Sequence, residues 1–278
     1  MKYSHLFRIS LLAIAAFVVS CNNNDKKADT NSSNGPSLKE ENVTYKNDSV
    51  TMNGFVVYDE NTKGARPAVL VVHEWWGLND YDKMRARELA KLGYIAMAVD
   101  MYGNGKTADN PTDAENLATP FYSNPKMAKS RFDAALSKLK TYSQVDQNNI
   151  AAIGYCFGGS MVLNMAKLGD DLKGVVSFHG VLGGNPPANK DLLRSKILVC
   201  HGGDDQFTPQ KDIDVFKKQL DSINADYTFK VYPGATHAFT NPAATELGKK
   251  FNLPIAYNAA ADSASWNDMK DFFGKIFK

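Results

Sequence analysis

Cys156 stands at the apex of a glycine-rich turn that joins an apolar run to a helix-like stretch. The apolar run covers residues 150–153, and the turn reads Gly-Tyr-Cys-Phe-Gly-Gly over residues 154–159. Glycine has no Cβ, so Gly154 and Gly158 allow a strand to reverse tightly into a helix. The positive end of that helix favours a thiolate on the apex residue. The pattern predicts a cysteine nucleophile, although a buried structural cysteine would have the same spacing.

Polar residues that could serve this nucleophile follow three other apolar runs. Glu74 follows one run, the pair Asp204 and Asp205 follows a second, and His237 follows a third. A nucleophilic thiol needs a histidine to exchange its proton and an acid to orient that histidine. The chain order of nucleophile, acid and histidine predicts that Cys156, one of the two aspartates and His237 meet at one edge of a sheet. A capping or surface role for His237 is the alternative.

The elements that must position these side chains alternate in type. Compact apolar runs lie at 68–72, 95–99, 150–153, 174–178, 197–199 and 227–231, and an antiparallel pair at 43–46 and 50–58 precedes them. Amphipathic stretches lie at 81–92, 126–142, 210–223 and 262–277. The alternation predicts an α/β fold, with a mainly parallel twisted sheet and helices on both faces, in a single domain over 43–278. Ligands of such folds bind at the carboxyl ends of the strands.

These motifs together resemble the dienelactone hydrolase family, whose cysteine-bearing members have the α/β-hydrolase fold. The family's Gly-Tyr-Cys-x-Gly-Gly stands at 154–159, and its Asp-x-Phe-x-Pro setting aligns with Asp205 rather than Asp204. Its histidine motif aligns with His237 and its glutamate with Glu74. The resemblance implies a hydrolase that cleaves a small-molecule ester or lactone through a Cys-His-Asp triad and an acyl-cysteine.

The resemblance also implies roles for the residues around the triad. Glu74 would take the thiol proton once substrate enters, whereas helix capping or pairing with an arginine is the alternative. Backbone N–H groups of Phe157 and Trp75 would form the oxyanion hole. Aromatic residues would line the substrate pocket, unless they belong to the core: Trp75, Trp76, Tyr102 and Phe239.

Two arginines that hold a substrate carboxylate in the family have no counterpart in this chain. Their expected positions carry Asn104 and Asn241, and Lys106 is the nearest cation to the first. Because arginine binds carboxylate through a bidentate fork, this departure favours neutral substrates.

The first twenty residues have the pattern of a bacterial lipoprotein signal peptide. Lys2 and Arg8 precede an apolar stretch, and Val-Val-Ser-Cys ends at Cys21. The pattern predicts cleavage before Cys21, lipidation of its sulfur and attachment to a membrane in the cell envelope; unlipidated secretion is the alternative. Residues 21–42 contain few side chains that could pack in a core, and we therefore expect them to form a flexible tether.

Composition excludes several other classes of function. Without Lys2 and Arg8 the chain has 30 basic and 30 acidic residues, so nothing indicates nucleic-acid binding. The histidines and the three cysteines lack metal-ligand spacing, and we expect no metal, no cofactor and a monomer. Cys200 ends an apolar run and is predicted to be a core residue. A binding lipoprotein on a hydrolase scaffold, or a peptidase or acyl-transferase of the same fold, remain the alternatives to hydrolysis.

Overall fold

The computed structural model describes residues 35–184 and 186–277. The predicted signal peptide and Cys21 lie outside these residues. Residues from Pro36 onward form one unit, which agrees with the prediction of a single folded domain. Among the described residues no helix is both long and apolar enough to cross a bilayer.

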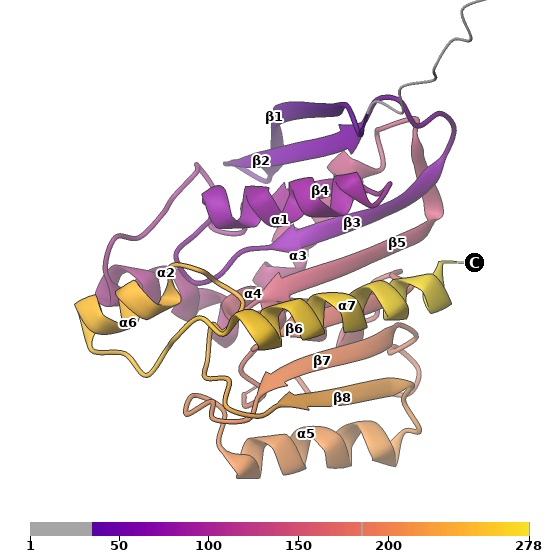
Figure 1. Cartoon of the computed structure of the whole chain (residues 1–278). Helices are drawn as coiled ribbons and strands as arrows, with labels where there is room; N and C mark the ends of the chain where they lie inside the picture. Colours follow the sequence, from indigo (N-terminus) through magenta and orange to yellow (C-terminus); the bar gives the residue numbers. More distant parts are fainter. Residues whose placement is uncertain (1–34, 185, 278) are drawn as a thin grey trace, which may run out of the picture. The chain divides into compact units, whose positions relative to one another are not determined.

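Eight strands in the described part of the chain form one sheet in the order β1-β2-β4-β3-β5-β6-β7-β8 (Figure 1). Their bounds are β1 Leu38–Asn47, β2 Val50–Asp59, β3 Arg66–Val72, β4 Ile95–Val99, β5 Val145–Tyr155, β6 Gly174–Phe178, β7 Lys196–Gly202 and β8 Tyr227–Tyr232. Strand β2 runs antiparallel to β1 and β4, whereas the pairings among β3 to β8 are all parallel. The predicted mainly parallel sheet is confirmed.

The first strand begins earlier than the sequence pattern indicates. Leu38 pairs with Asp59, and the ladder continues to Asn47 opposite Val50. Residues 38–42 therefore belong to the sheet, and the predicted tether over 21–42 is too long at its C-terminal end. The side chains of 38–42 are polar or half-exposed because β1 is an edge strand, so backbone pairing holds a segment that shows no apolar pattern.

Helices cover both faces of the sheet, as predicted. Their bounds are α1 Asp80–Lys91, α2 Pro111–Ser123, α3 Pro125–Leu139, α4 Phe157–Lys167, α5 Gln210–Ser222, α6 Ala244–Phe251 and α7 Ala259–Ile276. Helices α1 and α7 contribute to the core on one face, and α2 to α5 contribute to the core on the other. Two helices were not predicted from the sequence: α2, which contains Pro120, and α6, which is only eight residues long.

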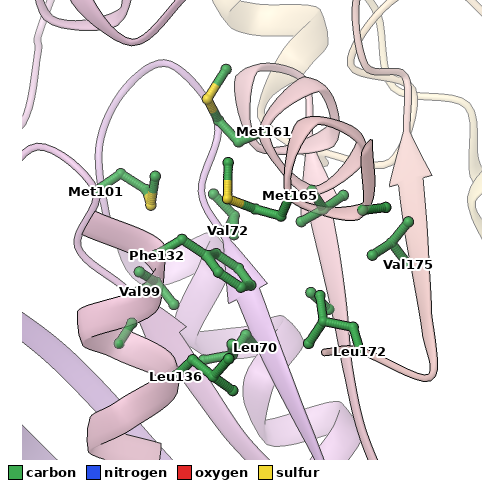
Figure 2. Packing of buried hydrophobic residues seen from close by; sticks show 14 of the residues in the cluster. Leu70, Val72, Val99, Met101, Phe132, Leu136, Met161, Met165, Leu172 and Val175 are labelled. Carbon is green, nitrogen blue, oxygen red and sulfur yellow. The ribbon is translucent and has the colours of Figure 1, made fainter. Parts of the chain in front are cut away.

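The alternating side chains of the central strand β3 anchor both cores. Leu70 and Val72 face α3 and α4, where Figure 2 shows Phe132 and Met161 packed near them. Val69 and Val71 belong to the core on the other face. This packing fixes the ends of β3 and β5 side by side, with Val72 paired to Gly154. The loops that carry Glu74 and Cys156 therefore leave the sheet as neighbours.

Candidate active site

Cys156 occupies a strained turn between β5 and α4. Its backbone has φ 52° and ψ −113°, a left-handed conformation that costs a residue other than glycine about 1–3 kcal/mol. A Cβ on Gly154 would lie 2.1 Å from the oxygen of Gly158, and a Cβ on Gly158 would lie 2.1 Å from the oxygen of Val72. Only glycine at both positions lets α4 begin so close to the strand ends. The sharp turn expected from the glycine pattern is present, with Cys156 half-buried at its apex.

His237 and Asp205 lie together beside this turn. His237 Nδ1 lies 2.8 Å from Asp205 Oδ2, and both side chains are buried. The other carboxylate oxygen of Asp205 accepts the Phe207 backbone N–H at 2.8 Å. Asp204 is exposed, so the structure selects Asp205 from the pair.

The Cys156 sulfur interacts with His237 through its charge and a hydrogen bond. Burial lowers the pKa of His237, but the charge and hydrogen bonding of Cys156 and Asp205 outweigh burial and raise it to about 10. Burial raises the pKa of Asp205, but the hydrogen bond and charge of His237, together with the Phe207 N–H, outweigh burial and leave it below its ordinary value. Asp205 and the Cys156 sulfur can therefore stabilise a protonated His237 ring between them.

A mostly apolar cavity with a volume of about 110 Å³ opens beside Cys156. Its walls are Trp75, Trp76, Ala118, Tyr122, Val181, Phe207, Ala238, Leu253 and Ile255 around Cys156, His237 and Glu74. Among the described residues, none that lines this cavity is a lysine or an arginine. The cavity therefore suits a neutral ligand.

Two of the predicted pocket aromatics belong to the core instead. Tyr102 is buried and donates its hydroxyl to the Trp75 carbonyl at 2.9 Å. Phe239 is fully buried, with its ring 5.3 Å from that of His179 and 5.5 Å from that of Tyr232. The prediction that Tyr102 and Phe239 line the pocket is wrong, whereas Trp76 does line it. Tyr102 instead holds the backbone of the loop that carries Trp75.

Glu74 lines the same cavity and is paired with an amide. Its Oε2 accepts a hydrogen bond of 2.6 Å from Asn241 Nδ2. Burial raises the pKa of Glu74 to about 7, although the bond from Asn241 opposes this. Helix α1 is capped by Asn79, so the alternative that Glu74 caps this helix is wrong.

The two positions of the missing carboxylate clamp, and the nearby Lys106, lie in different surroundings. Asn241 is buried and already holds Glu74. Asn104 and Lys106 are exposed, and Asn104 N–H donates to Thr51 of β2 at 2.6 Å. Neither Asn104 nor Lys106 lines the cavity, so the structure gives Lys106 no place as a substitute cation.

The two predicted oxyanion-hole residues lie on segments that adjoin the cavity. Phe157 begins α4 directly after Cys156, where a helix leaves its first N–H groups without intrahelical partners. Trp75 follows Glu74 in the loop after β3 and lines the cavity. The loop is held by His73, whose Nε2 accepts the Met101 N–H at 3.3 Å.

Most residues of the cavity wall were not predicted from the sequence. Tyr122 comes from α2, and Leu253 and Ile255 come from the segment that follows α6; neither helix was predicted. Val181 lies in the loop after β6. Its position near the site could have been predicted, because that loop also follows an apolar run. Nothing in the local pattern indicates that Leu253 and Ile255 reach the site.

The buried carboxyl of Glu74 predicts a pH-dependent stability. Between its ordinary pKa of 4.5 and about 7, the folded state holds a proton that the unfolded state has lost, so the free energy of unfolding falls as pH rises. A pKa difference of this size corresponds to about 3 kcal/mol. Glu74→Gln keeps an oxygen for Asn241 and should gain this much over the wild type between pH 4.5 and 8, measured by urea denaturation. A difference that does not vary with pH would contradict the prediction.

Comparison with known proteins places the chain in a family. The model of the dienelactone hydrolase family matches residues 52–277. "Protein usf" of Aquifex pyrophilus is 28% identical over 240 residues, 83% of this chain and 96% of that protein. "Putative carboxymethylenebutenolidase" of Methylorubrum extorquens is 28% identical over 220 residues, 76% of this chain and 72% of that protein.

A solved structure, the dienelactone hydrolase-like promiscuous phosphotriesterase P91 from metagenomic libraries, has a TM-score of 0.81 and 32% identity. The match covers 87% of this chain and 99% of P91. The residues matched by the family model run from β2 to the end of α7 and include every residue of the site described above. The chain therefore belongs to the dienelactone hydrolase family and is a hydrolase.

Proposed function

We propose that the protein hydrolyses neutral carboxylic esters or lactones through an acyl-cysteine on Cys156. The observation that carries the proposal is the position of Cys156, beside the His237–Asp205 pair and at the head of an apolar cavity. The relative named as a carboxymethylenebutenolidase agrees with this class of reaction.

The reaction follows from the order of these groups. His237 takes the proton of Cys156, and the thiolate forms a C–S bond with the substrate carbonyl carbon. Collapse of the tetrahedral species breaks the C–O bond, and the leaving oxygen takes the proton from His237. His237 then removes a proton from water, whose oxygen attacks the acyl carbon and releases the Cys156 sulfur. In a lactone the leaving oxygen stays attached to the acyl group.

The negative charge that develops on the carbonyl oxygen needs donors that are already in place. In this proposal the backbone N–H groups of Phe157 and Trp75 supply them, and each such donor contributes roughly 3 kcal/mol of transition-state stabilisation. The start of α4 adds a positive dipole end at the same point. Tyr102 supports the arrangement through its hydrogen bond to the Trp75 carbonyl.

In this proposal Glu74 is the alternative to His237 as the acceptor of the Cys156 proton. A pKa of about 7 leaves it near balance between its two forms at neutral pH. A substrate that enters the cavity and displaces the carboxylate from Asn241 would free it to take the Cys156 proton. Asn241 therefore has the role of holding Glu74 away from Cys156 between turnovers.

The strained backbone of Cys156 argues against the alternative of a binding protein on a hydrolase scaffold. Without catalysis, a residue other than glycine gains nothing from φ 52° at this position. An acyl-transferase would share every step up to the acyl-cysteine and differ only in its acceptor.

Neutral phosphotriesters are a second candidate substrate class. The structural relative P91 is titled a promiscuous phosphotriesterase. The lack of a lysine or arginine in the cavity wall of the described structure favours an uncharged triester over a charged monoester. In this reaction the Cys156 thiolate would form an S–P bond and release an alcohol, and water would then cleave the S–P bond.

The nucleophile is tested by replacing each of the two cysteines in the folded domain. Cys156→Ala should abolish ester hydrolysis without loss of fold, because Cys156 is half-buried and has no packing role. Cys200→Ala should keep the wild-type kcat, because Cys200 is fully buried in the core and outside the cavity. The measurement is kcat/KM on 4-nitrophenyl acetate, with circular dichroism to monitor the fold. Wild-type rates in Cys156→Ala would refute the acyl-cysteine.

Substrate charge provides a separate test. A carboxylated lactone loses hydrogen bonds to two arginines, each contributing roughly 1.5–3 kcal/mol, so its kcat/KM should not exceed that of neutral short-chain esters. Placing a cation in the wall by Tyr122→Arg should raise the relative rate on the carboxylated substrate. A panel of neutral esters, carboxylated dienelactone and 4-nitrophenyl diethyl phosphate measures the preference. A strong preference of the wild type for dienelactone would contradict this prediction.

The cellular location is a further part of the proposal. The Val-Val-Ser-Cys pattern before residue 22 supports a lipid anchor on Cys21 in the bacterial cell envelope. Two acyl chains suffice for stable attachment, whereas a single chain is marginal. The protein should partition into the detergent phase of a Triton X-114 extract, and Cys21→Ser should move it to the aqueous phase or leave it uncleaved. Aqueous partitioning of the unaltered protein would refute the anchor.

A further inference from the structure

His179 is a buried histidine to which the proposed reaction assigns no role. It follows β6 directly, is fully buried and has φ 41°, a left-handed conformation that costs energy for a residue other than glycine. Its backbone N–H donates to the Cys200 carbonyl at 2.8 Å. A strained residue at the C-terminal end of a central strand, next to the nucleophile, is where a functional constraint is expected.

The hydrogen bonds of His179 define its tautomer. The backbone N–H of Cys156 donates to His179 Nδ1 at 3.1 Å, in addition to the Phe178 carbonyl at 3.0 Å. An N–H group can only donate, so Nδ1 must present its lone pair and the ring proton must sit on Nε2. Nε2 lies 2.7 Å from Thr240 Oγ1, which therefore accepts that proton's hydrogen bond.

Thr240 is itself held firmly by residues of α1. Its hydroxyl lies 2.6 Å from the Tyr81 hydroxyl, and its carbonyl accepts Arg85 Nη2 at 2.7 Å. Thr240 lies three residues after His237 and directly before Asn241, which holds Glu74. The His179 side chain thus bridges the backbone of the nucleophile and the loop that carries the base.

The charges around His179 favour the neutral ring. Its ring centroid lies 5.3 Å from that of His237, and burial lowers the pKa of His179 well below its ordinary value. His237, Arg85 and His201 face it with positive charge and lower the pKa further. A second imidazolium beside His237 would oppose the protonation of His237 that the reaction needs.

We propose that His179 is a positioning residue that, as the Nε2–H tautomer, ties the Cys156 turn to Thr240 and so fixes the nucleophile relative to His237. The proposal rests on Cys156 being the nucleophile. It extends the site to two residues, His179 and Thr240, that do not line the cavity. The alternative is a histidine that only fills space between Tyr155 and Phe239.

Kinetics on matched variants separate these two roles. Thr240→Val removes the hydroxyl at constant volume, and His179→Asn keeps an acceptor for the Cys156 N–H but cannot reach Thr240. Each should lower kcat by about 3- to 10-fold with KM nearly unchanged, as the loss of one hydrogen bond would. The kcat of the double variant should be no lower than that of the less active single variant, because both substitutions remove the same link. Thr240→Ser should restore kcat.

Tyr81→Phe is the control for these variants. It removes the other hydroxyl partner of Thr240 and leaves the bond to His179, so kcat should stay near that of the wild type. Effects that multiply in the double variant, or a loss in Tyr81→Phe equal to that in Thr240→Val, would overturn the proposal. Free energies of unfolding measured on each variant separate a loss of kcat from a loss of fold.

A spectroscopic test can be made on the wild-type protein, without substrate, and does not depend on whether the variants fold. With ¹⁵N-labelled histidine, the ring of His179 should show an unprotonated Nδ1 and a protonated Nε2, unchanged between pH 6 and 9. An Nδ1–H tautomer, or titration in this range, would refute the role of His179. The outcome is independent of Cys156→Ala, which tests the nucleophile alone, so the failure of one proposal is distinguishable from failure of the other.

Discussion

The close approach of α4 to the ends of β3 and β5 is the constraint on which the rest of the site depends. Gly158 lies so near the Val72 carbonyl that no other residue fits, and this contact holds the helix start directly beneath the loop after β3. It forces the left-handed backbone of Cys156, which directs the sulfur into the cavity. The strain at Cys156 is offset by the two cores on either face of β3.

One short segment organises the buried polar groups around this turn. Between His237 and Asn241, three side chains each form a hydrogen bond to a different part of the site: His237 to Asp205, Thr240 to His179, and Asn241 to Glu74. These three side chains are therefore hydrogen-bonded, which offsets the cost of burying polar groups inside a protein. A shift of this segment would change the surroundings of His237, Cys156 and Glu74 together.

Substrate selection has a different origin from the catalytic groups. The catalytic side chains leave the sheet at strand ends, whereas Trp76 is enclosed by α2 and α6, which lie side by side (Figure 1). Ala114 of α2 and Phe251 of α6 belong to a small apolar cluster around Trp76, apart from the two main cores. Substitutions at residues of these helices that pack against Trp76 can therefore change the cavity without altering the strand ends that carry Cys156, Asp205 and His237.

The sequence by itself determined the mainly parallel sheet and the helices with strong apolar periodicity, and it placed Cys156, Asp205 and His237 at one edge of that sheet. These follow from local patterns, because strand ends of a parallel sheet converge at one edge. Only the tertiary structure decided that Asn241 holds Glu74, that Phe239 belongs to the core, and which residues form the cavity wall. Asn241 and Glu74 are 167 residues apart in the sequence, and the geometry of all these contacts depends on packing that no local pattern contains.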